Sequence, residues 1–237
     1  MPPTDDPRYP QLISLAVHEF RTPASVVSGY LRMLQRDSAS LSERQRKMID
    51  EAEKSCARII ALIAELSDVQ KLDVGLVTLK LQPLDVFTLA GEVAEHVQEA
   101  GDREVRLELR GAPSGGSIAG DATRLHSALD AIFSAILREK AGPCTVAVDR
   151  RLESREGRTS AVIVVAENQS VQAAYDGAAG VFDEKRGGLG LALPLARRVV
   201  EGVGGRIWSP ASRGGAEDDA LARGSVIMSF PVTEPNR

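Results

Sequence analysis

The stretch IDEAEKSCARIIALIAEL, residues 49–66, decides how the chain begins to fold. Its apolar residues recur in alternating steps of three and four, at Ile49, Ala52, Cys56, Ile59, Ile63 and Leu66. This spacing is the a/d pattern of a coiled coil, because it places the apolar side chains along one seam of a helix. Ser42 and Gln45 have the form of a capping box, so we expect the helix to start just after Ser42.

A second strongly helical stretch precedes this one. The polar turn Arg36 to Leu41 separates the two, so residues 12–71 predict a helical hairpin. A hairpin of this length has too little core of its own. Dimerisation into a four-helix bundle would bury both seams at once, and we therefore expect a homodimer built on a helical domain at residues 1–71.

Residues 72–237 show a different pattern, in which short alternating segments mix with helical ones. Val77, Leu79 and Leu81 alternate with polar residues and predict a strand that Pro83 closes. Further strands are expected at 105–109, 144–152, 160–166, 206–209 and 225–232, helices at 86–97, 121–140 and 189–203, and a loop at 212–223. This mixture predicts an α+β layer sandwich as the second domain.

Composition excludes several classes of function. A net charge of -4 and a pI near 5.5 leave no positive surplus for a phosphate backbone, so nucleic acid is not an expected partner. The longest apolar runs are far shorter than the roughly 20 residues that a bilayer requires, and Met1 to Pro10 is too polar for a signal peptide. Cys56 and Cys144 have no metal-site spacing. We expect a cytoplasmic protein with no membrane insertion and no metal site.

The hexapeptide His18-Glu19-Phe20-Arg21-Thr22-Pro23 lies in the first helical stretch. It resembles the H-box of sensor histidine kinases of two-component systems, and residues 12–34 resemble the first dimerisation helix of that family. The resemblance implies that His18 is the phosphoacceptor and that its partner is the receiver domain of a response regulator. The residue types suit this chemistry, since a neutral imidazole is nucleophilic and Glu19 can orient the ring and take up its proton.

Thr22 lies one helical turn after His18, on the same helix face. In the family, a residue at this position orients a water molecule that hydrolyses the aspartyl-phosphate of the partner. The resemblance therefore gives three catalytic candidates: His18, Glu19 and Thr22.

The second domain resembles the Bergerat-type ATP-binding domain of the same family, a fold shared with type II topoisomerases and related chaperones. Residues 121–125 resemble the start of the nucleotide-site helix, and residues 187–193 resemble the second glycine box. In such a box, glycines let the backbone approach phosphate, which makes Gly188 and Gly190 the candidate nucleotide contacts. The resemblance covers nearly the whole chain.

Several positions depart from the family pattern along this domain. The family has asparagines along the helix that starts at Asp121, one of which holds Mg²⁺. These positions fall on Ala131 and Ala135, whose methyl groups are no ligands for a hard cation. Glu167 stands where the family has the aspartate that binds adenine, and its additional methylene displaces the carboxylate by about 1.5 Å. These replacements predict that metal and base recognition are both lost.

Two further departures concern glycines and the lid. Gln169 and Val171 stand where the family has glycines, so their side chains would obstruct a ligand. Only Asp183, Glu184 and Lys185 separate Phe182 from Arg186, which is too short for a lid over a triphosphate. We therefore expect no cofactor, with ATP and Mg²⁺ bound only if the domain is an active kinase with an unusual site.

Three functions fit these observations. The first is a dimeric histidine phosphotransferase, with a phosphatase activity through Thr22, that exchanges a phosphoryl group between His18 and an aspartate of a response regulator without ATP. The second is an ATP-dependent histidine kinase that autophosphorylates on His18. The third is a docking scaffold that sequesters a response regulator. An intact H-box beside an altered nucleotide site favours the first.

Overall fold

A computed structural model describes residues 8–37, 41–97, 103–155, 157–212 and 214–233. The chain forms two compact units, Met1–Val77 and Thr78–Arg237. The division between these units falls after Val77, whereas the sequence analysis drew the domain boundary after Lys71. The first unit is helical and the second contains both helices and strands, so the mixed α+β class is confirmed.

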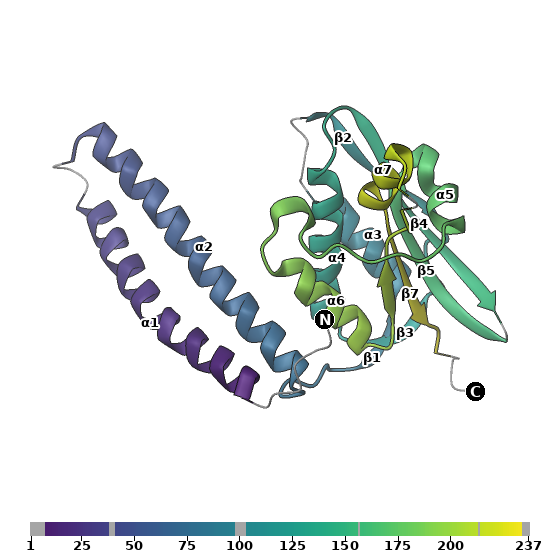
Figure 1. Ribbon diagram of the computed structural model, residues 1–237, viewed down its shortest axis with the longest axis horizontal. Helices are drawn as coiled ribbons and strands as arrows, with labels where there is room; N and C mark the ends of the chain where they lie inside the picture. The colour runs from purple at the N-terminus through teal and green to yellow at the C-terminus, as the bar shows by residue number, and fades with distance from the viewer. Residues whose placement is uncertain (1–7, 38–40, 98–102, 156, 213, 234–237) are drawn as a thin grey trace. The chain divides into compact units, whose positions relative to one another are not determined.

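The first unit is a hairpin of α1 (Arg8–Arg36) and α2 (Glu43–Asp73), as predicted (Figure 1). The predicted capping box is present at the start of α2. Ser42 Oγ accepts a hydrogen bond from the Gln45 backbone N–H at 3.4 Å, and Gln45 Oε1 accepts one from the Ser42 N–H at 2.9 Å. Residues 38–40 of the expected turn lie outside the described residues.

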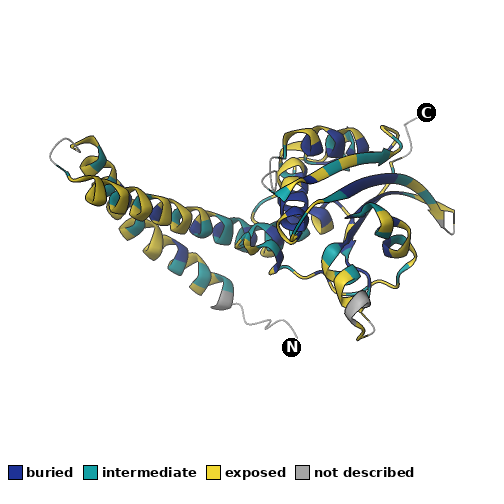
Figure 2. Ribbon diagram, turned by 90° about the horizontal axis from the view of Figure 1, so that it is seen from above, coloured by how far each residue is buried: buried dark blue, intermediate teal, exposed yellow. Residues whose placement is uncertain are grey.

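Polar contacts fix the antiparallel register of the two helices. Cys56 Sγ donates to the Ala24 carbonyl at 3.2 Å, and Gln35 Nε2 donates to Asp50 Oδ1 at 2.9 Å. The predicted apolar seam of α2 is divided between two faces: Cys56 and Ile63 are buried, while Ala52 and Ile59 are exposed. The hairpin thus buries only part of its apolar surface. Figure 2 shows that most residues of α1 and α2 are exposed.

The second unit is built on a five-stranded sheet in the order β2-β4-β5-β7-β6. The strands are β2 (Val105–Gly111), β4 (Cys144–Arg155), β5 (Arg158–Glu167), β6 (Arg206–Trp208) and β7 (Val226–Pro231). Only β2 and β4 are parallel; the other neighbours are antiparallel. A separate two-stranded sheet pairs β1 (Gln82–Asp85) with β3 (Ser117–Gly120).

Helices cover both faces of the large sheet (Figure 1). One face carries α3 (Val86–His96) and α4 (Ala122–Arg138), and α6 (Ala192–Gly202) packs against α4. The opposite face carries α5 (Val171–Asp176) and α7 (Ala216–Gly224), where Val171, Ala174 and Leu221 pack with residues of β5 and β7. Two short 3₁₀ turns, η3 (Asn168–Ser170) and η4 (Arg186–Gly188), precede α5 and α6.

The strand predicted at Val77–Leu81 is wrong. The first strand begins at Gln82 and contains Pro83, which lies on a two-stranded edge where a missing N–H is tolerated. The backbone N–H of Lys80 donates instead to Asp121 Oδ2 at 3.1 Å, and Leu79 packs against Gly202 of α6. Leu79 therefore packs on α6 while Leu81 is 53% exposed, so the alternation of this segment is not that of a paired strand.

The loop predicted at residues 212–223 is also wrong, because α7 occupies most of it. The short elements β3 and α5 were not predicted either. No helix within the described residues is both long and apolar enough to cross a membrane.

Candidate functional site

The candidate catalytic residues lie on α1 and are open to solvent. The side chains of His18 and Glu19 are 81% and 68% exposed, and His18 Nδ1 lies 3.4 Å from Glu19 Oε1. The other ring nitrogen, Nε2, has no hydrogen-bond partner among the described residues. A carboxylate at Nδ1 favours the tautomer with its proton there, which leaves the lone pair on Nε2 for attack on phosphorus.

Thr22 is exposed on α1, one turn after His18. The helix continues through Pro23 to Arg36, so the regular helical geometry that places Thr22 on the His18 face is maintained. The structure therefore brings the three predicted catalytic residues together on one accessible surface of the hairpin.

The nucleotide-like region of the second unit centres on α4. Ala131 and Ala135, the positions where the sequence analysis expects replaced asparagines, are 9% and 0% exposed. A Cβ atom on Gly187 would lie 2.7 Å from the Ala135 Cα, so the backbone of η4 packs directly on α4. Ala131 and Ala135 have no side-chain oxygens that could bind a metal ion. The close packing also leaves no gap between η4 and Ala135.

Glu167, at the end of β5, is already paired. Lys140 Nζ donates to Glu167 Oε1 at 3.0 Å and to the Gly224 carbonyl at 3.4 Å, and the Lys140 side chain is only 9% exposed. Gln169 Nε2 donates to the second carboxylate oxygen at 3.3 Å. Both oxygens of Glu167 thus have hydrogen-bond donors from this chain.

Val171 does not project toward a ligand but into the apolar cluster under α5. Its side chain is 5% exposed and packs with residues of β4, β5 and β7. The position expected to obstruct a ligand therefore serves as part of the core.

Gly188 and Gly190 both have positive φ values, 61° and 69°. Only glycine adopts this left-handed backbone readily, which explains the residue type without a ligand. Gly188 has open space where a Cβ atom would lie, whereas the neighbouring Gly187 makes the close approach to Ala135.

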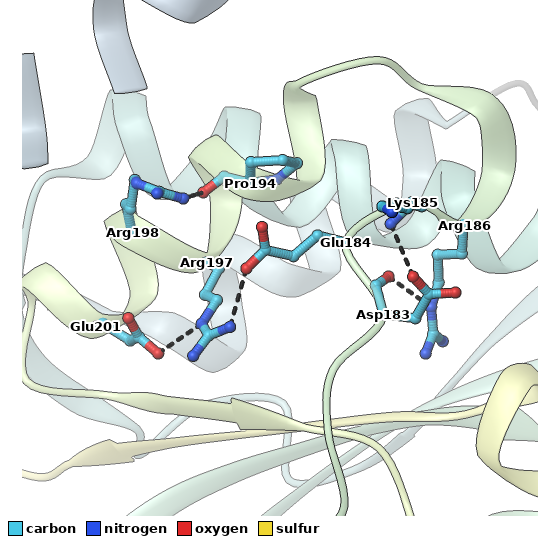
Figure 3. A network of polar contacts seen from close by, with 8 residues as sticks. All are labelled: Asp183, Glu184, Lys185, Arg186, Pro194, Arg197, Arg198 and Glu201. Atoms are coloured by element: carbon cyan, nitrogen blue, oxygen red, sulfur yellow. Dashed lines mark hydrogen bonds and ion pairs between the residues drawn. The ribbon is translucent and has the colours of Figure 1, made fainter. Parts of the chain in front are cut away.

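The short segment Asp183 to Lys185, which the sequence analysis expects to be too short for a lid, is tied to α6 (Figure 3). Glu184 Oε1 accepts a hydrogen bond from Arg197 Nη1 at 2.9 Å, and Arg197 Nε also donates to Glu201 at 2.8 Å. These two carboxylates raise the pKa of Arg197, through their hydrogen bonds and charge. The Lys185 N–H donates to Asp183 Oδ1 at 2.9 Å, which closes a tight turn.

Arg186 is buried beside this segment, with 5% of its surface exposed. Its guanidinium donates to Ser209 Oγ at 2.7 Å and to the carbonyls of Arg223 and Ser225 at 3.0 and 3.2 Å. Burial lowers the pKa of Arg186 and raises the pKa of the nearby Glu139, whose carboxylate also feels the charge of Arg186. Arg186 therefore joins η4 to the end of α7.

Sequence reasoning missed Lys140, Glu139, Arg186 and Arg197 as residues that close this region. Their partners lie between 13 and 84 positions away along the chain, apart from local contacts such as that of Arg197 with Glu201. No local pattern marks such pairs. One feature of the sequence could have indicated such contacts: the segment after Phe182 is short, so Arg186 must lie near α6.

Comparison with known proteins identifies the first unit. The family "His Kinase A (phospho-acceptor) domain" matches residues 11–75, which include α1, α2 and His18. "Probable sensor histidine kinase TcrY" of Mycobacterium tuberculosis is 31% identical over 220 residues, or 87% of this chain and 44% of that protein. The chain belongs to the histidine kinase family. "Sensor histidine kinase GacS" of Pseudomonas protegens is 27% identical over 203 residues. That alignment covers 80% of this chain and 22% of GacS.

Solved histidine kinases share the fold. The structure titled "Crystal structure of ShkA full-length in complex with AMPPNP" matches 95% of this chain with a TM-score of 0.65 and 20% identity. The match covers 47% of the ShkA chain. The Acinetobacter baumannii histidine kinase AdeS covers 92% of this chain and 98% of its own, with a TM-score of 0.53 and 15% identity. This histidine kinase family member spans less than half of TcrY and about a fifth of GacS.

Proposed function

We propose that this member of the histidine kinase family is a dimeric histidine phosphotransferase that has lost ATP binding. In this proposal His18 exchanges a phosphoryl group with an aspartate in the receiver domain of a response regulator, in the cytoplasm. The observation that carries it is the contrast between an accessible His18–Glu19 pair and a tightly packed region around Ala135.

The transfer step follows from the geometry at His18. Nε2 attacks the phosphorus of the aspartyl-phosphate, a nitrogen–phosphorus bond forms, and the bond from phosphorus to the aspartate oxygen breaks. The carboxylate of Glu19 at Nδ1 stabilises the positive charge that develops on the ring and can accept its proton. The aspartate leaves as a carboxylate, and the reverse reaction returns the phosphoryl group.

The packed region supports loss of the nucleotide. Phosphoryl transfer from ATP depends on positioning and on neutralisation of charge, mostly by a metal ion. Ala131 and Ala135 supply no oxygen ligands, and Glu167 is paired with Lys140. Glu184 ties the short segment 183–185 to Arg197. The residues present do not fit ATP with its magnesium ion.

Exposed apolar residues on the hairpin support the homodimer. Large apolar side chains of α1 that are at least half exposed include Leu12, Leu15, Phe20, Val26, Val27, Tyr30 and Met33. Such a surface is unusually apolar for a monomer and is of the kind that a second hairpin would bury in a four-helix bundle.

The test measures acid-labile phosphate on His18 with two donors. The purified protein is incubated with γ-labelled ATP and Mg²⁺, or with a phosphorylated response regulator, and His18→Gln is the control. We expect labelling from the regulator only, and none in His18→Gln. Labelling from ATP that disappears in His18→Gln would establish an autophosphorylating kinase, and labelling from neither donor would leave a docking scaffold.

Thr22 provides a second test. Thr22→Ala should slow dephosphorylation of the regulator more than transfer between the regulator and His18, because the hydroxyl positions a water molecule only for hydrolysis. Rates of the two reactions are compared in the same preparation. Equal loss of both would exclude that role for Thr22.

A further inference from the structure

The sheet is hollowed on the face that carries α5 and α7, away from α4. A cavity of about 610 Å³ opens there among β5, β6, β7 and the segment 175–179, with Val162, Ile227 and Trp208 among its lining residues. A second hollow of about 670 Å³ shares Arg158, Ser160, Arg206 and Ser229 with the first. We name the two hollows together the dibasic trough, after Arg158 and Arg206.

Strand register explains why these residues share one face. Ser229 of β7 lies opposite Val162 of β5 on one side and opposite Arg206 of β6 on the other. Side chains alternate along each strand, so Arg158 and Ser160 project on the same side as Val162. At the other end of this face, the side chains of α5 and α7 cover β5, while the end that carries Arg158 is left open.

The two arginines of the dibasic trough line both hollows, whereas its aromatic side chains line only the first. Among its described residues, the second hollow is lined, besides Arg158 and Arg206, by hydroxyl and apolar groups and contains no carboxylate. The other hollow is lined by Trp208 and Tyr175, by the same two arginines, and by Glu153 and Asp176. Glu153 lies opposite Ser160 in the pairing of β4 with β5. A ligand that combines an anionic group with a flat apolar ring matches the arginines and the aromatic side chains.

Arg158 and Arg206 differ from the ion-paired arginines of the unit. Arg110, Arg151 and Arg197 each form an ion pair with a carboxylate. Arg158 and Arg206 are exposed and form no ion pair with a described residue, and the Arg206 guanidinium lies 5.6 Å from the centroid of the Trp208 ring. A guanidinium presents a planar fork of donors that matches the oxygens of a phosphate group.

We infer that the dibasic trough binds a small phosphate-bearing aromatic molecule of the nucleotide class. The phosphate lies at Arg158 and Arg206, with Ser160 and Ser229 as neutral donors, and the ring lies against Trp208 and Tyr175. The cavity volume lies within the usual range for small-molecule sites, roughly 300–1,000 Å³. This site is separate from α4 and does not depend on the proposed function.

Trp208 makes the inference directly testable, because it is the only tryptophan of the chain. Its fluorescence is followed while the full-length protein is titrated with AMP, with adenosine and with inorganic phosphate. We expect a saturable change with AMP, at a concentration at least about tenfold lower than for adenosine or phosphate, because only AMP combines the phosphate with the ring. No saturable change with AMP up to about 1 mM would overturn the inference.

Variants then locate the binding. Arg158→Gln and Arg206→Gln should each raise the dissociation constant for AMP about tenfold, since each removes a charge-assisted hydrogen bond. Arg106→Gln is the matched control, because Arg106 is an exposed strand residue of β2 with no ion pair among described residues. Circular dichroism checks the fold of each variant. Unchanged AMP binding in both trough variants, or equal loss in Arg106→Gln, would overturn the assignment.

Discussion

Helices α1 and α4 are both long and amphipathic, but they meet different surroundings. Along α1, apolar residues such as Leu12, Leu15 and Tyr30 are 58–63% exposed. Along α4, Leu129 and Phe133 are fully buried, because the helix packs between the sheet and α6. The hairpin therefore retains a large apolar surface for another molecule, whereas the α/β unit buries most of its large apolar residues internally.

The same contrast separates the two candidate sites. His18 is open to a macromolecular partner, while the backbone of η4 at Gly187 packs directly against Ala135. A site that must react with another protein has to be exposed, and a packed interior favours stability over ligand binding. Four predictions test this difference, in order of decreasing effect.

The largest effect is expected at the exposed face of α1. Leu15→Glu combined with Val26→Glu should raise the dimer dissociation constant at least about a thousandfold, about 4 kcal/mol, because each change would bury an unpaired charge in the bundle. Analytical ultracentrifugation measures the constant. A dimer of unchanged affinity would place the interface elsewhere, and Arg44→Glu on exposed α2 is the control.

The second prediction concerns the core of the α/β unit. Phe133→Ala should lower the free energy of unfolding by about 3–5 kcal/mol, since it leaves a cavity beneath α4. Denaturant unfolding followed by Trp208 fluorescence reports on this unit, and Leu15→Ala in the exposed hairpin should leave that transition unchanged. A cost below about 1 kcal/mol for Phe133→Ala would contradict tight packing.

The third prediction tests Arg186. Arg186→Met should lower the free energy of unfolding by about 3 kcal/mol, because the carbonyls of Arg223 and Ser225 lose their buried donor. Arg197→Met is the matched control and should cost less than about 1 kcal/mol, since its ion pairs are partly exposed. Both are measured by denaturant unfolding, and similar costs would show that Arg186 has no special structural role.

The smallest effects are expected at two helix caps, one in each unit. Asp121→Ala removes the cap of α4 and Ser42→Ala the cap of α2, each at a cost of about 1 kcal/mol at pH 7. Although desolvation acts in the opposite direction, hydrogen bonds from the Lys80 and Arg124 N–H groups hold the pKa of Asp121 below its ordinary value.

The pH dependence should distinguish these caps. Because the folded pKa of Asp121 is lowered, its carboxylate stabilises the fold above the unfolded pKa of about 3.9, and this contribution is lost as the pH falls further. The difference in the free energy of unfolding between wild type and Asp121→Ala should therefore narrow below about pH 4. The corresponding difference for Ser42→Ala should stay constant. Thermal unfolding at several pH values measures both, and a constant difference for Asp121→Ala would exclude a charged cap.

Regular patterns made most elements predictable. The capping box at Ser42, the helices of the hairpin and the paired strands β4 and β5 follow from local spacing and local chemistry. The segment Val77–Leu81 was misassigned because its alternation is not that of a paired strand, and Leu79 packs on α6 instead. Helix α7 was missed because its last carbonyls receive hydrogen bonds from Arg186, which lies far away in the sequence.

The sequence by itself determined the helical hairpin and the hexapeptide at His18, and it predicted replacements at Ala131, Ala135 and Glu167, because each depends on residue type and local spacing. Tertiary structure decided how those replacements are accommodated. Gly187 packs on Ala135, Lys140 neutralises Glu167, and Arg186 fastens η4 to α7. It also decided that Arg158 and Arg206 lie together on one open sheet face, since strand pairing sets which distant residues become neighbours.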